Sequence, residues 1–300
     1  DYVGKNGFPG ALVGLSGGVD SALTLCIACD ALGPERVRAV MMPSQYTSEM
    51  SLEDSRELVA NLGVRYDEIP IRPVFDAFLA SLAKEFSRLP SDATEENLQA
   101  RIRGTLLMAL SNKFGAMVLT TGNKSEMSVG YATLYGDMNG GFNPIKDLYK
   151  MEVYSLSRWR NAHVPKGAKG PGRVVIPERI LSKAPTAELR ENQKDQDSLP
   201  PYEALDDILT CLVEQEMSLA EIIARGHDAE TVKKVERLLY IAEYKRRQAA
   251  PGVKISARNF GRDRRYPITN KFREDIAAAH TTPATAPRVV APRADGGEVS

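Results

Sequence analysis

Residues 10–21 read GALVGLSGGVDS, an apolar run that leads into a turn of serine, glycine and aspartate. The apolar run, residues 10–15, is short, continuous and bounded by glycine and serine, so it predicts a buried parallel strand. The glycines of residues 16–21 let the backbone turn tightly, and a helical pattern over residues 22–32 follows. A strand, a glycine turn and a helix in this order gather several backbone N–H groups in one concavity, which favours the binding of phosphate.

Strands and helices continue to alternate through the first half of the chain. This alternation predicts right-handed βαβ units in an α/β fold with a doubly wound, mainly parallel sheet. Ligands of such sheets bind at the carboxyl ends of the strands, near a switch in strand order. Two expected strands end in small polar turns, residues 16–21 and 121–128, which predicts one site built from both. The expected strands are residues 10–15, 37–42, 64–69 and 116–121, and the expected helices are residues 22–32, 51–62, 74–86 and 95–114.

The second half of the sequence predicts a helical C-terminal part. Residues 166–173 are glycine-rich and basic, and residues 191–201 are polar with a proline pair, so both are interpreted as loops. Residues 276–300 are rich in alanine, threonine and proline and predict a disordered tail, which leaves residues 1–275 as one domain. The further expected helices are residues 151–160, 205–213, 219–224 and 229–247.

The composition of the 300 residues limits the class of protein. Lysine plus arginine and aspartate plus glutamate both total 39, so the net charge is zero and no nucleic-acid partner is expected. Hydrophobic residues make up 43%, as in proteins that bury a real core. No apolar run reaches the roughly 18 residues that cross a membrane, and no signal peptide is apparent, so no membrane association and a cytoplasmic location are expected.

The chain has three cysteines, Cys26, Cys29 and Cys211, an odd number and too few for a disulfide scaffold. Cys26 and Cys29 form a C-x-x-C within an apolar run, and the sequence offers no second pair to complete a zinc site. We therefore interpret these two as ordinary buried helix cysteines rather than as metal or redox groups.

The glycine turn has chemical groups suited to a polyphosphate and a metal. Ser16 and Ser21 can donate hydroxyl hydrogen bonds to phosphate, whereas Asp20 repels phosphate because both groups are negative. Asp20 is therefore interpreted as a Mg²⁺ ligand beside the phosphates. The turn lacks the lysine of the G-x-x-x-x-G-K-[ST] loop and also differs from the G-x-G-x-x-G dinucleotide turn. The plainer alternative is a glycine turn capped by serine or aspartate, which the six-residue string in its strand–turn–helix context disfavours.

The string SGGVDS after an apolar strand resembles the pyrophosphate loop of the N-type ATP pyrophosphatases, whose fold is adenine nucleotide alpha hydrolase-like. Three further blocks resemble the synthetase domain of glutamine-dependent NAD⁺ synthetases, and the pairing of NKSE with KAPTAEL in this order is specific to that family. The resemblance covers roughly residues 5–275. The blocks are LTTGNKSEMSVGYATLYGD at residues 119–137, IPERILSKAPTAEL at residues 176–189 and YKRRQAAPG at residues 244–252.

The resemblance implies a two-step reaction. The nicotinate carboxylate of deamido-NAD⁺ attacks the α-phosphate of ATP, which gives an adenylate and pyrophosphate. Ammonia then displaces AMP and leaves the amide of NAD⁺. Because a carboxylate is a poor acyl donor, adenylation supplies a good leaving group, and catalysis is then mostly positioning and charge neutralisation.

The resemblance also assigns roles to residues of this sequence. Asp20 and Glu126 are implied to share Mg²⁺, which prefers such hard oxygen ligands. The residues implied to bind ATP or to act on it are Gly14, Ser16, Gly17, Gly18, Asp20, Ser21, Thr121, Lys150 and Thr186. The residues implied to bind deamido-NAD⁺ are Asn97, Arg101, Glu126 and Lys245.

Taken one at a time, several of these residues have plainer interpretations. Lys150 alone is typical of a solvated lysine at a helix start, and Glu126 alone of an acid favoured by a helix dipole. Arg101 and Arg103 alone suggest a solvated helix face, and residues 245–247 a charged helix end. Only the joint pattern of the four blocks favours a role in a site.

Two departures from the single-domain, ammonia-using synthetases favour the two-domain subfamily. This chain has TTGNKSE where they carry a GTDHAAE-like block, and Tyr244 precedes Lys245 where they carry histidine. In the two-domain enzymes a nitrilase-like glutaminase with a Glu–Lys–Cys triad precedes the synthetase. No cysteine of this chain sits in such a block, so we expect a glutaminase domain or subunit as a partner and ammonia as the nitrogen donor of this chain.

The resemblance further implies a homodimer, with deamido-NAD⁺ bound near the subunit interface. The amphipathic residues 205–213 and 232–240 are candidate apolar surface for such a dimer. They could equally close the core of a monomer, and the sequence leaves both alternatives open.

Two other functions compete with the synthetase. The first is another ATP pyrophosphatase, such as GMP synthetase or a tRNA-thiolating enzyme, but a thiolating enzyme needs cysteines near its substrate, and Cys26 and Cys29 lie on the first helix of the sheet. The second is a non-catalytic nucleotide-binding module, which has no need for two metal-binding acids such as Asp20 and Glu126.

Overall fold

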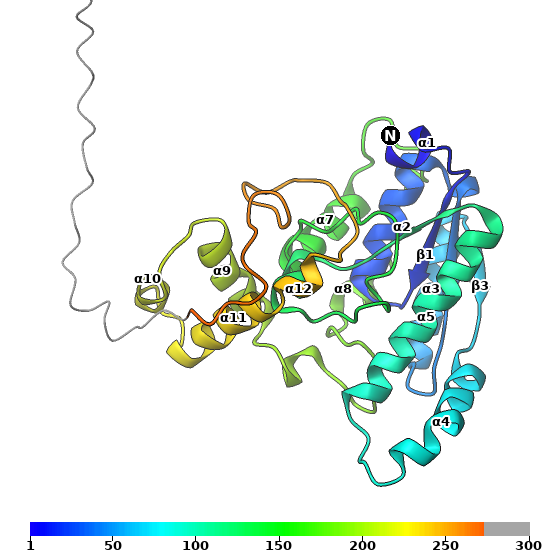
Figure 1. Cartoon of the computed structure of the whole chain (residues 1–300). Helices are drawn as coiled ribbons and strands as arrows, with labels where there is room; N and C mark the ends of the chain where they lie inside the picture. The colour runs from blue at the N-terminus through cyan, green and yellow to red at the C-terminus, as the bar shows by residue number, and fades with distance from the viewer. Residues whose placement is uncertain (273–300) are drawn as a thin grey trace, which may run out of the picture.

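The computed structural model describes residues 1–272 and centres on a four-stranded parallel sheet (Figure 1). Its strands are β1 (Ala11–Leu15), β2 (Val37–Met41), β3 (Arg65–Glu68) and β4 (Met117–Leu119). The strand order is β3-β2-β1-β4, so the order switches between β1 and β4. Val13 of β1 lies in register with Ala39 of β2 and Leu119 of β4. All four expected strands are confirmed; β1 and β2 are one residue shorter than expected, β3 two and β4 three.

Helices cover both faces of the sheet and confirm the doubly wound α/β fold. On one face lie α2 (Val19–Leu32), α3 (Glu49–Leu62), α7 (Lys150–Ala162) and α8 (Glu178–Ser182), and on the other lie α4 (Arg72–Phe86) and α5 (Ala93–Phe114). Successive strand residues point to opposite faces, so Val13 and Leu119 join the core with α2 while Leu12 and Val118 join the core with α5. The central strands are buried on both sides, which is why they are continuous apolar runs.

Capping residues determine where the helices of the sheet layers begin. Ser48 accepts the backbone N–H of Ser51, so α3 starts two residues before its expected start. Asp92 starts α5 through a capping box with Glu95, again two residues early. These side chains satisfy backbone N–H groups that the first turn of a helix leaves without a partner.

The C-terminal part packs its helices around a separate core, to one side of the sheet layers in Figure 1. The helices are α9 (Tyr202–Val213), α10 (Leu219–Ala224), α11 (Ala229–Ile241) and α12 (Glu243–Arg246). The apolar faces of α9 and α11 meet inside this core, where Leu205, Leu209 and Val235 are fully buried. Of the two alternatives for these segments, the structure therefore favours closure of the monomer's own core.

Residues 229–247 form two helices rather than the single helix that was expected. α11 ends at Ile241, Ala242 closes it, and α12 begins at Glu243. Arg246 of α12 is buried, and its guanidinium donates to the carbonyl oxygens of Leu239 and Ser128. The interpretation of residues 245–247 as a charged, solvated helix end is therefore wrong for Arg246, because tertiary contacts overrule the local pattern.

Three short helices were not expected from the sequence, namely α1 (Tyr2–Lys5), α6 (Lys124–Val129) and α8. Helices of four to six residues are too short to show the 3.6-residue period. α2 also begins at Val19 rather than at residue 22, so the end of the glycine turn belongs to the helix. The expected tail, residues 276–300, lies outside the described residues, as do residues 273–275 of the expected domain.

The cysteines behave as the sequence predicted. Cys26, Cys29 and Cys211 are free and buried, and burial raises the pKa of the Cys26 and Cys29 thiols above its ordinary value. Cys26 and Cys29 both lie buried on α2, as predicted. Within residues 1–272, no helix combines the length and the apolar character needed to cross a membrane.

Gly10 marks a close approach of two backbone segments where the chain enters β1. A Cβ atom at this position would lie 2.2 Å from the carbonyl oxygen of Arg36, a distance that real Cβ atoms do not reach. The guanidinium of Arg36 holds the segments together, since it donates to the carbonyl oxygens of Pro9 at 2.8 Å and Phe8 at 3.1 Å. Glycine is required at this position because the backbone of Arg36 leaves no room for a Cβ atom, and not because of the backbone dihedral angle.

We expect Gly10→Ala to lower the free energy of unfolding by about 1–3 kcal/mol, because the added methyl group must push β1 away from Arg36. Gly4→Ala is the matched control. Nothing lies within 4 Å of a Cβ at that helical position, so stability should stay unchanged or rise slightly. Urea unfolding followed by circular dichroism measures both variants, and equal midpoints would contradict the close contact.

Candidate functional site

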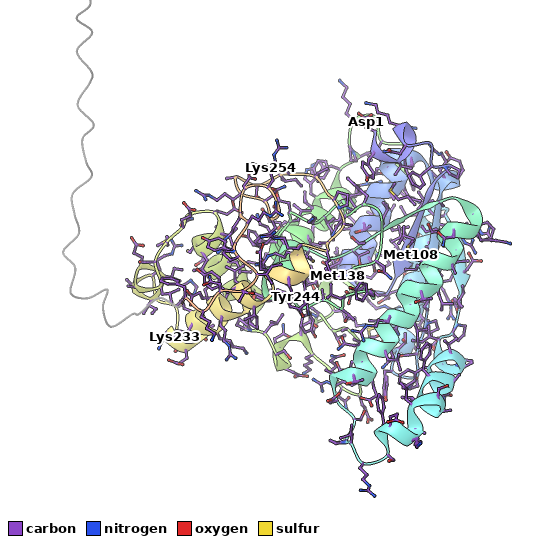
Figure 2. The ribbon with its side chains drawn as sticks, in the orientation of Figure 1. Asp1, Met108, Met138, Lys233, Tyr244 and Lys254 are labelled. Atoms are coloured by element: carbon purple, nitrogen blue, oxygen red, sulfur yellow. The ribbon has the colours of Figure 1, made fainter. Side chains whose placement is uncertain are left out.

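A cavity of about 280 Å³ opens at the carboxyl ends of β1 and β4, where the strand order switches. Its walls include the glycine loop at residues 16–21, residues 119–122 at the end of β4, and residues 183–189 after α8. Met138, another wall residue, lies in the middle of the molecule between the sheet layers and the C-terminal helices (Figure 2). The two polar turns singled out in the sequence therefore meet in one site, as the topology predicts.

Contacts within the glycine loop hold it in shape. Gly17 has a φ of 78°, which other residues rarely adopt, and a Cβ there would lie 2.8 Å from the backbone of Ser51. Ser21 Oγ donates to the carbonyl oxygen of Gly18 at 3.0 Å and accepts the backbone N–H of Ser16 at 3.2 Å. Because α2 begins inside this loop, the positive end of its dipole lies at the cavity.

Lys150 lies at the centre of the charged part of the site. It is the first residue of α7 and only 3% exposed, and its ammonium pairs with Asp20 and lies 3.7 Å from Glu126. Burial disfavours the charged ammonium, but the two carboxylates outweigh burial and raise the pKa of Lys150 above its usual value. The interpretation of Lys150 as a solvated lysine is therefore wrong.

The first turn of α6 brings two more groups to the cluster. Asn123 caps α6, and its amide nitrogen donates to Oδ1 of Asp20 at 2.8 Å. Glu126 accepts the backbone N–H of Asn123 at 3.2 Å, and its carboxylate lines the cavity. Burial and the nearby charge of Asp20 raise the pKa of Glu126 to about 8, although Lys150 opposes the shift. Glu126 is thus a helix-start acid, as its local pattern indicates, and also a group of the cavity.

Asp20 and Glu126 are chemically suited to hold a divalent cation. Both carboxylates line the same cavity, and the pKa of Glu126 is raised because burial and the charge of Asp20 disfavour its ionised form more than Lys150 favours it. Mg²⁺ is commonly bound by one or two carboxylates together with phosphate oxygens and water. In the described part of the chain, no group of three or more acidic, histidine or cysteine side chains is arranged as a metal site. Oxygens of a bound phosphate would therefore have to complete the ligand set.

All the residues that the resemblance assigns to ATP surround this one cavity. Gly14 and Thr121 line it beside the glycine loop, and Thr186 lines it from the segment after α8. The hydroxyl of Thr186 donates to the carbonyl oxygen of Gln193 at 2.6 Å, so in this structure it shapes its own loop. The contacts of these residues with ATP stay predictions. The structure shows that the residues line the same cavity.

The residues assigned to deamido-NAD⁺ divide into two groups. Glu126 lines the cavity, whereas Asn97, Arg101 and Lys245 all contact the adjacent residues 130–134. Asn97 accepts the hydroxyl of Thr133 at 2.8 Å, and Arg101 donates to the carbonyl oxygen of Leu134 at 3.2 Å. Lys245 donates to two carbonyl oxygens of the same segment, at 2.7 Å each. Asn97, Arg101 and Lys245 thus come together around residues 130–134. They do not line the cavity themselves, whereas Tyr131 and Ala132 of that segment do.

Lys183 and Glu188 belong to the site but were not singled out from the sequence. Lys183 lines the cavity, and its ammonium donates to Ser51 Oγ at 2.5 Å and to Glu188 Oε1 at 2.8 Å. Glu188 also accepts the hydroxyl of Ser48 at 2.8 Å, so it fastens its loop to the start of α3. Both residues stand in the quoted KAPTAEL string, but a loop has no periodic pattern that would mark them.

Arg103 and Asp137 are two further wall residues that the sequence did not assign to the site. Arg103 donates to the carbonyl oxygen of Met42 at 2.9 Å, and burial lowers its pKa to about 10. Asp137 lines the same cavity although its residue is exposed, and it accepts the backbone N–H of Thr133 at 2.8 Å. The interpretation of a solvated helix face therefore holds for Arg101, which is exposed, and not for Arg103, which is half-buried and hydrogen-bonded to Met42.

Comparison with known proteins decides the family. The chain matches the family model described as NAD synthase over residues 1–249. The chain belongs to the NAD synthase family. It is 54% identical over 274 residues to the glutamine-dependent NAD(+) synthetase of Rhodobacter capsulatus, a match that covers 91% of this chain and 50% of that protein. The chain spans about half the length of the curated relatives that it matches.

Solved structures of NAD synthetases share the fold. The glutamine-dependent NAD⁺ synthetase from Acinetobacter baumannii, in complex with adenosine diphosphate, is 52% identical with a TM-score of 0.58, and the match covers 89% of this chain and 47% of that one. The NH3-dependent NAD synthetase from Campylobacter jejuni, in complex with the nitrate ion, is 31% identical with a TM-score of 0.61, covering 79% of this chain and 86% of that one. The predicted family and fold are confirmed.

Glu126 should make the stability of this NAD synthase family member depend on pH. Its pKa rises from an ordinary value of 4.5 when unfolded to about 8 when folded, so the folded state binds the proton more tightly. Between these values stability falls as pH rises, and the full cost is present above about pH 8. We expect Glu126→Gln to gain stability relative to the unchanged protein as pH rises from 6 to 9.

Urea unfolding at pH 6, 7, 8 and 9 measures this difference. Glu221→Gln is the matched control, because hydrogen bonds from Ser218 lower the pKa of Glu221. Any effect of its ionisation on stability therefore changes with pH only below this range. A stability difference for Glu126→Gln that stays constant from pH 6 to 9 would show that the pKa of Glu126 is not raised.

Proposed function

We propose that this chain catalyses the ATP-dependent amidation of deamido-NAD⁺ to NAD⁺ through a nicotinate adenylate, with release of AMP and pyrophosphate. The observation that carries the proposal is the cluster of Asp20, Glu126 and Lys150 beside the glycine loop. Family membership supports it, as do the relatives described as NAD(+) synthetases. A module that only binds nucleotide has no need for two acids around a buried lysine.

In the first proposed step, a carboxylate oxygen of deamido-NAD⁺ bonds to the α-phosphorus of ATP, and the bond from that phosphorus to the bridging oxygen of pyrophosphate breaks. The glycine loop and the start of α2 would bind the phosphates through backbone N–H groups. Lys150 would stabilise the charge that collects on the departing pyrophosphate, because its own position is already fixed by Asp20. The ADP in the Acinetobacter baumannii relative supports a nucleotide at this fold.

Asp20 and Glu126 are the residues that would hold Mg²⁺, which neutralises phosphate charge when it is bound. Because the pKa of Glu126 is raised to about 8, cation binding near neutral pH has to displace its proton. Lys150 keeps one positive charge between the two carboxylates, which limits their repulsion of the phosphates.

In the second proposed step, ammonia bonds to the carbonyl carbon of the adenylate, the bond from that carbon to the AMP oxygen breaks, and the nitrogen releases one proton. We propose that deamido-NAD⁺ lies along residues 130–134, because this segment borders the cavity at Tyr131 and Ala132. Asn97, Arg101 and Lys245 would hold that segment and, through it, the substrate.

The nitrogen source of this chain is proposed to be ammonia itself. Its three cysteines are buried, and burial raises the pKa of the thiols, so none has the character of an attacking thiolate. The relatives are described as glutamine-dependent and are about twice as long, which supports a glutaminase domain or subunit as partner. A homodimer stays a proposal that rests on the family resemblance, and a cytoplasmic location stays a prediction from the sequence.

We expect Asp20→Asn and Glu126→Gln each to lower kcat at least about tenfold, because each removes an anionic oxygen from beside the polyphosphate. Asp76→Asn is the control, since Asp76 is an exposed acid on α4. The assay contains ATP, Mg²⁺, deamido-NAD⁺ and ammonium, and chromatography follows NAD⁺ and AMP. Unchanged rates at saturating Mg²⁺ would rule out the metal-binding role, and ADP as the nucleotide product would rule out adenylation.

The purified chain should make NAD⁺ from ammonium and not from glutamine. Because ammonium loses its proton well above neutral pH, free ammonia increases about tenfold per pH unit, and the rate at low total ammonium should climb between pH 7 and 8.5. Repeating the series at constant free ammonia separates this effect from the ionisation of Glu126. Formation of NAD⁺ from glutamine, with contaminating ammonium removed, would contradict the proposed nitrogen source.

A further inference from the structure

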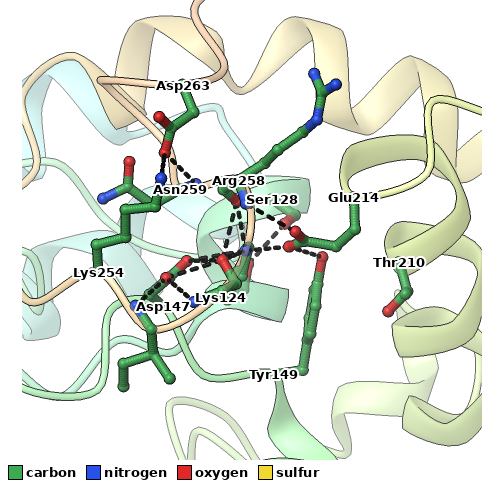
Figure 3. A network of polar contacts seen from close by, with 12 residues as sticks. Lys124, Ser128, Asp147, Tyr149, Thr210, Glu214, Lys254, Arg258, Asn259 and Asp263 are labelled. Atoms are coloured by element: carbon green, nitrogen blue, oxygen red, sulfur yellow. Dashed lines mark hydrogen bonds and ion pairs between the residues drawn. The ribbon is translucent and has the colours of Figure 1, made fainter.

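Lys124, the first residue of α6, is a fully buried cation with an exposed fraction of 0%. Figure 3 shows its ammonium at the centre of a network of polar contacts, and the rings of Tyr149 and Phe260 lie 5.0 and 5.8 Å from it. The polar contacts of its Nζ are Glu214 Oε1 at 2.5 Å, Ser256 Oγ at 2.6 Å, the carbonyl oxygen of Arg258 at 2.7 Å and Asp147 Oδ1 at 2.8 Å.

A buried lysine at this position is unfavourable by itself. Burial removes the hydration of the ammonium, and a positive charge at the N-terminal end of a helix opposes the helix dipole. Asp147 and Glu214 supply the opposite charge. Burial of Asp147 also disfavours its charge, but hydrogen bonds from Lys124 and Ser256, among others, outweigh burial and hold its pKa below the ordinary value. Lys124 is therefore tolerated only within the complete network.

The network joins parts of the chain that are far apart in sequence. Asp147 accepts the backbone N–H groups of Ile255 and Ser256, both at 2.7 Å. Glu214, directly after α9, accepts the backbone N–H of Arg258 at 2.9 Å. Through these contacts Lys124 connects the first turn of α6 both to the end of α9 and to residues 255–258.

The same turn of α6 holds two groups of the candidate site. Asn123, which precedes Lys124, donates to Asp20, and Glu126, two residues after it, lies 3.7 Å from the ammonium of Lys150. α6 has only six residues, so it has little helical structure of its own to keep that turn in place. Any shift of the turn moves Asn123 and Glu126 together.

We propose that Lys124 is a positioning residue for the adenylation site, which it serves by clamping the first turn of α6 against Asp147, Glu214 and residues 255–258. This inference rests on the proposed function. It adds that a network buried behind the site, and a segment near the C-terminal end of the described chain, set the places of Glu126 and, through Asn123, of Asp20.

The test separates positioning from mere stability. Lys124→Met keeps much of the apolar volume but leaves Asp147 and Glu214 without their cation, so both stability and kcat should fall. The double variant Lys124→Met/Glu214→Gln removes one of the two uncompensated charges and should recover part of the lost stability. Its kcat should stay at least about tenfold below that of the unchanged protein, because the clamp on α6 is still absent. The KM for ATP should change by less than about threefold, since the glycine loop is not disturbed.

Arg160→Met is the matched control for loss of a buried cation. Arg160 is 3% exposed and pairs with Asp30 through two hydrogen bonds of 2.6 and 2.9 Å, at the opposite ends of α2 and α7 from the site. The Arg160→Met variant should be less stable than the unchanged protein, but its kcat per folded molecule should stay the same. Ser256→Ala is a milder probe, because it removes one hydrogen bond of Lys124 and the hydroxyl hydrogen bonds to Asp147 but leaves all the charges paired. It should fold and lower kcat about threefold.

Stopped assays of AMP and NAD⁺ at saturating substrates, with the folded fraction measured by circular dichroism, provide the readout. A double variant that recovers kcat along with stability would reduce Lys124 to a structural role and overturn the proposal. If neither Lys124 variant folds, Ser256→Ala decides, and an unchanged kcat in that variant overturns the proposal as well. An unchanged protein that forms no AMP and no NAD⁺ would instead contradict the proposed function.

Discussion

The candidate site depends on one buried ion cluster, in which the ammonium of Lys150 is held by Asp20 and faces Glu126. The three residues belong to the first turns of α2, α6 and α7, so three helix starts have to converge on one point. Each charge would be costly if it were buried alone, and the cluster is tolerated because its members compensate one another. The parallel sheet makes this convergence possible, since β1 and β4 are neighbours and their following loops leave the sheet at the same edge.

The charges of the cluster do not cancel, because one ammonium lies beside two carboxylates. This excess of acidic groups affects both the stability of the fold and the proposed function. Two carboxylates share one nearby ammonium, and burial together with the charge of Asp20 raises the pKa of Glu126 to about 8. Ionisation of Glu126 without a bound cation therefore lowers the stability of the folded chain. On the proposed function, a bound cation would compensate this charge. Sites that bind and react are commonly less stable than they could be, because their charges are arranged for the ligand and not for the free protein.

A second buried lysine, Lys124, lies close to the cluster in the sequence of α6. Lys150, the first residue of α7, lines the cavity, whereas Lys124, the first residue of α6, does not line it and binds Asp147 and Glu214. Between them, α6 is held at its first turn by charges on two sides. Residues 255–258 complete the rear network through backbone groups, which explains how the end of the described chain can influence a site formed by the first and fourth strands. The family comparison adds that this unit is about half of the relatives' length.

The sequence by itself determined the parallel sheet, the helices that cover it and the place of the site, because central strands must be apolar and the Ser16–Ser21 loop needs glycine at the tight turn. It also singled out Asp20, Glu126 and Lys150 through their joint pattern, and the structure brings the three together. The break between α11 and α12 and the burial of Arg246 and Lys124 could not be predicted, since local patterns of charge are typical of solvated helix ends. Only the tertiary structure decides which charges are buried, because the compensating partner comes from a segment distant in sequence.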